Sequence, residues 1–76
     1  MSAIELVKRV MNEVMPSKDF EGITDIVEGG YITSFELMQL IAALEKECNL
    51  QIGFEDITPE NFNSLEAIAE MVNRKK

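Results

Sequence analysis

Apolar residues recur at helical spacing in the first part of the chain. Within 2–15 they fill one half of a helical wheel, and charged and amide side chains fill the other half. This segregation predicts an amphipathic helix with one face buried in a core. Ser2 and Glu5 have the spacing of a capping box. Pro16 ends the helix, because proline disfavours helical geometry at the residue before it.

A second apolar stripe lies within 34–48 and predicts the second helix. The stripe consists of Leu37, Leu40, Ile41, Leu44 and Cys48. We expect the opposite side to face solvent through Glu36, Gln39, Ala43, Lys46 and Glu47. Thr33 is the expected N-cap, with Glu36 as its partner three residues on, and Asn49 is the expected stop.

A short helix and then a third main helix are predicted near the end of the chain. Thr58 as cap followed by Pro59 at the first helical position predicts a short helix over 58–62. Asn63 or Ser64 then caps a final helix that extends to about residue 73. Its inward stripe is Leu65, Ile68, Ala69 and Val72.

The connections between these helices differ in kind. Segment 16–33 holds spaced apolar residues, and a bare loop of that length is unusual in a compact domain. We expect it to pack across the helices, with a short helical turn near 24–28. Segment 50–54 alternates like a strand but has no partner strand, so we predict none. The fold class is therefore all-α: one domain over 1–76, a four-helix bundle with three main helices, one short helix and a long first loop.

The composition of the chain disfavours several classes of catalytic site. A chain of 76 residues buries only about 60% of its extended surface, which leaves little room for a deep catalytic pocket. It has no histidine, the commonest general base and metal ligand, and Cys48 is its only cysteine. A small hydrolase is disfavoured on these grounds. We predict no enzyme, no catalytic residues and no metal site.

Charge narrows the partners. The net charge of −7, from 14 acidic and 7 basic residues, repels nucleic acid and anionic lipid and favours basic partners. No apolar stretch approaches the roughly 20 residues that span a bilayer, and the first residues lack the basic region of a secretory signal. A single thiol fits a reducing compartment. We expect a cytoplasmic monomer that binds no nucleic acid and inserts in no membrane.

Ser34 carries the most specific chemistry in the chain. It follows the Gly29-Gly30 turn and begins the second predicted helix, with no base to activate it. This favours a hydroxyl that another protein modifies over a nucleophile. A phosphodiester on Ser34 would lie at a helix N-terminus, where free N–H groups and the dipole favour an anion. The alternative is that Ser34 is only a capping serine.

Other side chains of the second helix suggest a docking surface. Glu36, Glu45 and Glu47 would steer basic partners, unless they form an ordinary solvated face. Met38, close to Ser34, could line an adaptable cavity for acyl groups, and core filling is the alternative.

The order of elements resembles the acyl carrier protein family over essentially the whole chain. Thr33-Ser34-Phe35 resembles the family's Asp-Ser-Leu or Asp-Ser-Phe attachment motif, with threonine in place of the aspartate. Threonine still caps a helix well. The segments 36–45, 50–52 and 58–64 resemble the family's second helix, its apolar-acid-Ile segment, and its third helix with the following cap. With Phe35 in place of leucine after the serine, the chain resembles the stand-alone peptidyl and D-alanyl carriers of this family more than its fatty-acid carriers.

The resemblance implies a covalent 4′-phosphopantetheine on Ser34, moved from coenzyme A by a separate phosphopantetheinyl transferase. The arm's thiol would hold acyl or aminoacyl groups as thioesters, loaded by a ligase and presented to downstream acyl-processing enzymes of fatty acid, polyketide or nonribosomal peptide biosynthesis. The expected partner-binding residues are Thr33, Phe35, Glu36, Met38, Gln39, Glu45 and Glu47. The rival hypothesis is an unmodified acidic helical adaptor that binds basic proteins non-covalently.

Overall fold

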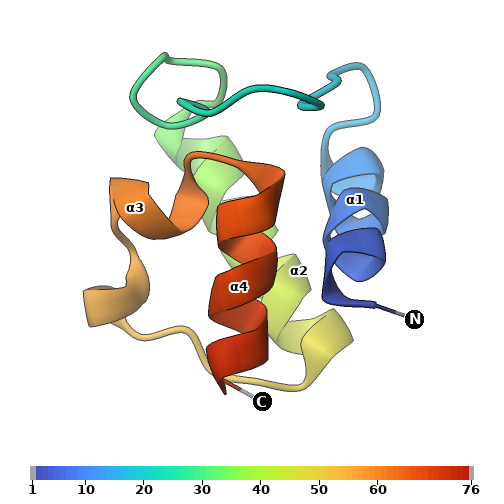
Figure 1. Cartoon of the computed structure of the whole chain (residues 1–76), viewed down its shortest axis with the longest axis vertical. Coiled ribbons are helices and arrows are strands. Elements are labelled where there is room, and N and C mark those ends of the chain that lie inside the picture. The colour runs from blue at the N-terminus through green and yellow to red at the C-terminus, as the bar shows by residue number, and fades with distance from the viewer. Residues whose placement is uncertain (1, 76) are drawn as a thin grey trace.

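Helices make up the regular structure of the described chain, residues 2–75 of the computed structural model (Figure 1). The elements in order are α1 (Ala3–Val14), α2 (Ser34–Cys48), the 3₁₀ helix η1 (Phe54–Asp56), α3 (Pro59–Phe62) and α4 (Leu65–Lys75). The all-α prediction with three main helices and one short helix is confirmed, and no strand forms within 2–75. The 3₁₀ turn was not predicted.

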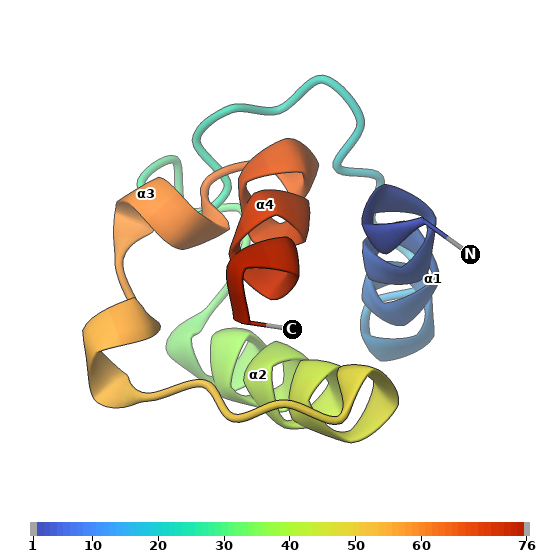
Figure 2. The same ribbon diagram turned by 60° about the horizontal axis from the view of Figure 1, so that its bottom comes forward.

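One core is shared by the three long helices and α3. α1 packs against both α2 and α4, and α3 packs against α4. Figure 2 shows α2 across the bottom of the view, with α1 and α4 above it. The most deeply buried side chains come from all four α-helices and from the long connection before α2. They are Val7, Val10, Ile26, Leu40, Leu44, Phe62, Ile68, Met71 and Val72. The apolar stripes predicted for α1, α2 and α4 therefore form the core.

Ala43 corrects the predicted outward face of α2. It is partly buried against the core instead of fully facing solvent. Three helical positions after Leu40 place Ala43 only about 60° from it around the helix axis, at the flank of the buried arc. Leu37 and Cys48, at the ends of the predicted stripe, are partly buried against the same core.

Local hydrogen bonds set where the helices begin. The Glu5 backbone N–H donates to Ser2 Oγ at 3.3 Å, and the Ser2 N–H donates to Glu5 Oε1 at 3.2 Å, so the predicted capping box at α1 is confirmed. Of the two candidates for α4, Ser64 is the cap, since its Oγ accepts the Ala67 N–H at 3.0 Å.

Thr58 precedes α3 as predicted, but its side chain makes no capping bond. Pro59 has no N–H to offer, and the Asn61 N–H donates to the Thr58 carbonyl at 3.1 Å, which closes this single turn through the backbone. The side-chain cap expected of Thr58 was therefore wrong, whereas Pro59 at the first helical position is confirmed.

The long connection before α2 packs across the helices, as predicted. In Figure 1 it crosses the top of the molecule from α1 to the start of α2. Phe20 and Ile26 of this connection are buried in the core. The helical turn expected near 24–28 is instead a series of hydrogen-bonded turns over Ile26–Gly30. Gly30 has φ of 75°, in the left-handed region that favours glycine, and this conformation prevents a helix from continuing.

Asn63 fastens this connection to the junction of α3 and α4. Its Oδ1 accepts the N–H groups of Val27 at 3.0 Å and Glu28 at 3.1 Å, and its carbonyl accepts the Ile26 N–H at 2.8 Å. Its Nδ2 donates to Glu28 Oε1 at 2.8 Å. One residue thus accepts three backbone donors of the connection, two on its side chain and one on its carbonyl.

Removing the Asn63 amide should release the connection. Asn63→Ala leaves the Val27 and Glu28 N–H groups without their acceptor, and we expect the free energy of unfolding to fall by about 1–2 kcal/mol. Urea denaturation measures the loss, and hydrogen exchange should quicken first at Val27 and Glu28. Asn73→Ala, at an exposed position of α4, is the control and should be close to neutral. Equal losses in the two variants would contradict this role for Asn63.

Three carboxylates make stability depend on acid pH. A backbone hydrogen bond from Ser2 lowers the pKa of Glu5, and one from Thr33 with the Lys18 ammonium lowers the pKa of Glu36. Lys75, with its Nζ 2.7 Å from Asp56 Oδ2, and the Gly53 N–H lower the pKa of Asp56. Since folding lowers these pKa values, their contribution to stability is present above the unfolded-state values and is lost as pH falls through the folded-state values.

We expect the melting temperature to fall on acidification below about pH 4, the ordinary range of these carboxyls. Asp56→Asn should lower the melting temperature at pH 7 and flatten its dependence on pH. Circular dichroism melts from neutral to acid pH test this, with Glu70→Gln on the exposed side of α4 as control. A wild-type-like pH profile in Asp56→Asn would rule out the Asp56–Lys75 pair as a cause.

Candidate functional site

Ser34 is the first residue of α2, and the hydroxyl of the residue before it does the capping. The Glu36 N–H donates to Thr33 Oγ1 at 3.1 Å, and the Thr33 N–H donates to Glu36 Oε1 at 2.8 Å. The alternative that Ser34 serves as the capping serine is therefore wrong. Within 2–75 no hydrogen bond engages the Ser34 side chain, which is exposed.

The first turn of α2 suits an anion on Ser34. Thr33 takes up two donors of this turn: its Oγ1 accepts the Glu36 N–H, and its carbonyl accepts the Leu37 N–H at 3.0 Å. The N–H groups of Ser34 and Phe35 precede the intrahelical bonds and remain open to a ligand. Together with the positive end of the helix dipole, they favour a phosphate group on the Ser34 oxygen.

Large apolar side chains are exposed in the same first turns of α2 as Ser34. Phe35 is 72% exposed and Met38 is 60% exposed. Core filling, the alternative explanation for Met38, is therefore wrong. Gln39 follows on the same exposed side. Large exposed apolar side chains close together in one helix are typical of a surface that another protein covers.

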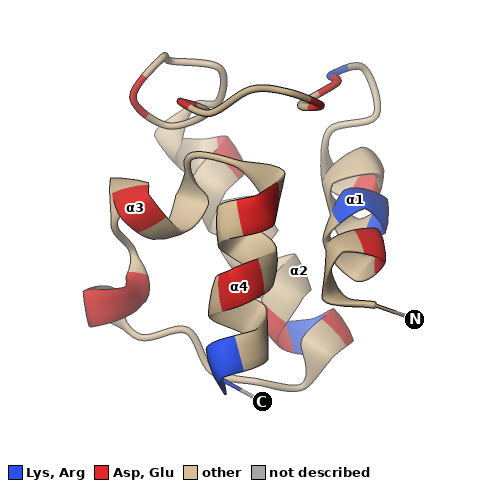
Figure 3. Cartoon of the chain, viewed as in Figure 1, with Lys and Arg blue, Asp and Glu red and all other residues tan. Residues whose placement is uncertain are grey.

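The carboxylates expected to dock basic partners are bonded within the chain. Glu36 Oε1 forms an ion pair with Lys18 Nζ at 2.9 Å, and Glu47 Oε1 forms one with Arg9 Nη2 at 2.8 Å. Glu45 Oε2 accepts the Ile52 backbone N–H at 2.9 Å. Figure 3 shows acidic positions on every labelled helix instead of a concentration on α2. The charge of α2 is thus partly compensated before any partner arrives.

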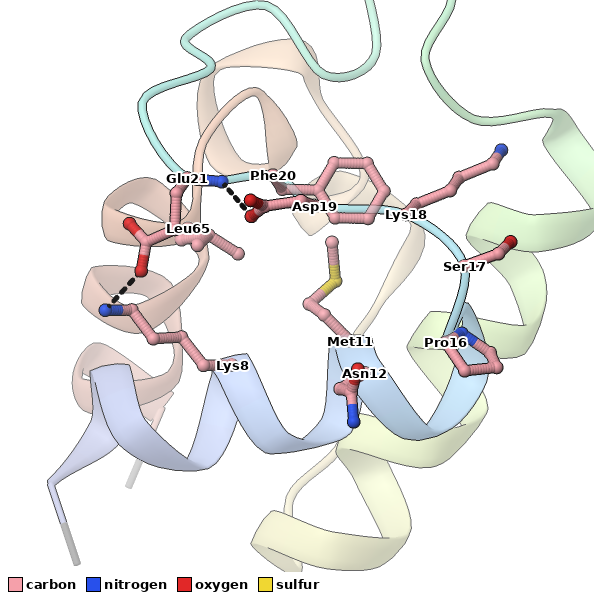
Figure 4. Close-up of a pocket in the computed structure, with 10 residues that line it drawn as sticks. All are labelled: Lys8, Met11, Asn12, Pro16, Ser17, Lys18, Asp19, Phe20, Glu21 and Leu65. Atoms are coloured by element: carbon pink, nitrogen blue, oxygen red, sulfur yellow. Dashed lines mark hydrogen bonds and ion pairs between the residues drawn. The ribbon is translucent and has the colours of Figure 1, made fainter.

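A cavity of about 340 Å³ lies between α1 and segment 16–21 (Figure 4). Met11, Phe20 and Leu65 contribute its apolar surface, and the Lys8–Glu21 ion pair at 2.7 Å stands at its edge. Ser34 does not line it. Lys18 does, but Figure 4 shows its ammonium extending away from Met11 toward α2. The cavity is therefore separate from the Ser34 site.

Two further observations bear on metals and membranes. The described residues include no group of three or more His, Cys, Asp or Glu side chains that could hold a metal ion. In the same part of the chain, no helix is long and apolar enough to cross a bilayer.

Sequence reasoning missed Lys18. Its ammonium donates to the Tyr31 carbonyl at 2.9 Å and to both oxygens of Glu36, at 2.9 and 3.0 Å. No periodicity marks a loop lysine whose partner lies in another element. The available signal was its isolation, because it is the only basic residue between Arg9 and Lys46.

Comparison with known proteins gives one informative relative. No protein-family model matches the chain, and no solved structure matches it. Aminoacyl carrier protein 1 of Bradyrhizobium diazoefficiens is 33% identical over 69 residues, which cover 91% of this chain and 76% of that protein. Similarity of this extent, together with the all-helical fold, shows that the chain belongs to the carrier protein family.

Proposed function

We propose that this protein carries acyl or aminoacyl groups as thioesters on a 4′-phosphopantetheine arm attached to Ser34 Oγ. The observation that carries the proposal is the exposed Ser34 hydroxyl, which starts α2 and is spared from capping by Thr33. A carrier needs such a hydroxyl, accessible from outside and free of an internal task. The aminoacyl carrier protein from Bradyrhizobium supports an aminoacyl cargo.

The attachment step requires another protein. In this step the Ser34 oxygen would form a bond to the phosphorus that bears the pantetheine in coenzyme A. The pyrophosphate bond breaks, the adenosine half leaves with its phosphates, and the serine proton passes to a base. Among residues 2–75 no side chain bonds to the Ser34 hydroxyl to serve as that base, so a phosphopantetheinyl transferase would supply it. The resulting phosphodiester is then stabilised by the N-terminus of α2.

The physical role of the carrier is to raise local concentration. A thioester on a tethered arm meets each docked enzyme intramolecularly, so its effective concentration is set by the length of the arm instead of by bulk diffusion. The loading ligase and the downstream acyl-processing enzymes would therefore compete for one surface on the carrier, the surface around Ser34.

We propose that these enzymes dock on the exposed start of α2. Phe35 and Met38 would form the apolar centre of the contact, with Thr33 and Gln39 beside them. Glu36, Glu45 and Glu47 would contribute at the rim, where their internal partners must first be exchanged. Apolar anchors at the centre and charges at the rim are the usual division in protein interfaces.

The rival adaptor function lacks such support. A non-covalent acidic adaptor that docked through α2 would first have to displace the internal partners of its carboxylates, which are Lys18, Arg9 and the Ile52 N–H. It would also leave the free Ser34 hydroxyl without a role.

Intact mass tests the attachment. Incubation with a promiscuous phosphopantetheinyl transferase and coenzyme A should add one phosphopantetheine to the wild type and none to Ser34→Ala. Helicity and melting of Ser34→Ala should be nearly unchanged, because this exposed hydroxyl bonds to nothing within 2–75. Ser17→Ala, at an exposed loop position, is the control and should be modified like the wild type. Mass gain that persists in Ser34→Ala would refute the assignment.

Substitution of the apolar centre tests docking. Phe35→Ser and Met38→Ser should each lower the rate constant for modification at limiting substrate by about tenfold, as truncation of an interface anchor does. Phe54→Ser is the matched control: Phe54 is 90% exposed on η1 and should affect the rate little. If the three variants slow modification equally, or none does, α2 does not dock through Phe35 and Met38.

A further inference from the structure

A single ammonium group bridges the two sides of Ser34. Lys18 Nζ donates to the Tyr31 carbonyl, three residues before the serine, at 2.9 Å. It also donates to Glu36, two residues after the serine, at 2.9 Å to Oε1 and 3.0 Å to Oε2. A lysine ammonium has three donors, so these three contacts use its whole capacity.

The same carboxylate closes the cap of α2. Glu36 Oε1 accepts the Thr33 N–H at 2.8 Å while it receives Lys18. Lys18, Glu36 and Thr33 thus form a connected set that holds the last residues of the loop against the first turn of the helix. The hydrogen bond from the Thr33 backbone and the Lys18 ammonium both lower the pKa of Glu36, which keeps this carboxylate ionised and able to accept both donors.

We propose that Lys18 is a positioning residue for the modification of Ser34. By bonding Tyr31 and Glu36 at once, it fixes the segment Tyr31–Glu36 so that the Ser34 hydroxyl is presented outward in one orientation. This inference rests on the proposed function of Ser34. It assigns the role to a residue outside the attachment motif and outside the predicted docking surface.

Two physical roles of Lys18 predict opposite signs. If Lys18 only neutralised Glu36, its removal would make the chain one charge more acidic, and a basic transferase would meet it faster. If Lys18 positions the segment, its removal allows Ser34 to adopt several positions, and modification slows. Reactions are sensitive to such loosening, since a displacement of about 1 Å can cost about a hundredfold in rate.

Lys18→Met and Lys8→Met make a matched pair for the experiment. Each removes one lysine and breaks one ion pair, Lys18–Glu36 at 2.9 Å or Lys8–Glu21 at 2.7 Å. Both lysine side chains are at least one-third exposed, so either loss should lower the melting temperature only modestly, and more for Lys18, whose partner Glu36 is less exposed than Glu21. Only Lys18 contacts residues that flank Ser34.

We expect Lys18→Met to lower the rate of phosphopantetheine transfer by about tenfold, within the range of such positional effects. Lys8→Met should leave the rate unchanged. Lys18→Arg, whose guanidinium can still bridge a carbonyl and a carboxylate, should restore most of the rate. A rate in Lys18→Met equal to or above that of the wild type would overturn the inference, as would a failure of Lys18→Arg to exceed Lys18→Met.

A double-mutant cycle with Glu36→Gln tests whether Lys18 acts through Glu36. Loss of Lys18 should slow modification much less in the Glu36→Gln background than in the wild type, because the connected set is already broken. Strictly additive effects would overturn the connected set. These outcomes differ from failure of the proposed function itself, in which the wild type would gain no phosphopantetheine at all.

Discussion

The capping box at the start of α2 is the interaction on which the position of Ser34 depends. Thr33 donates its N–H to Glu36 and accepts the Glu36 N–H on its hydroxyl, which makes Thr33 the N-cap and Ser34 the first helical residue. A shift of the helix start by one residue would turn Ser34 into the cap and consume its hydroxyl. Because Thr33 caps well, a helix start at Ser34 does not require the aspartate that usually precedes the serine in this family.

The long connection before α2 serves the same end by different means. It has no helix of its own, yet Phe20 and Ile26 bury its apolar side chains, and Asn63 accepts its backbone donors. Lys18 then ties its first part to its last part. An irregular segment held at several separated points can bring a serine to the surface in a defined place, which would suit the proposed modification of Ser34.

Much of this architecture could be predicted because its causes are local. Periodicity placed the helices, and capping residues with Pro59 placed their starts, since each depends on residues within one turn. The contacts of Lys18 with Glu36, Asn63 with Val27, and Arg9 with Glu47 join residues far apart in the chain. Such pairings follow from how the helices pack, so no spacing in the sequence announces them. The 3₁₀ turn at Phe54–Asp56 is closed by local bonds between Gly53 and Asp56, whereas the ion pair of Asp56 with Lys75 comes from the distant α4.

The internal ion pairs of the α2 carboxylates affect how a carrier would associate with successive partners and dissociate from them. A partner whose arginine reaches Glu36 or Glu47 must displace Lys18 or Arg9, so one exposed ion pair replaces another with little net gain in free energy. Under the proposed function, charge would contribute to the encounter, while Phe35 and Met38 would supply most of the residence time. A carrier that visits several enzymes in succession would benefit from such contacts. Each complex would form quickly and dissociate quickly, so the carrier would be available to the next enzyme.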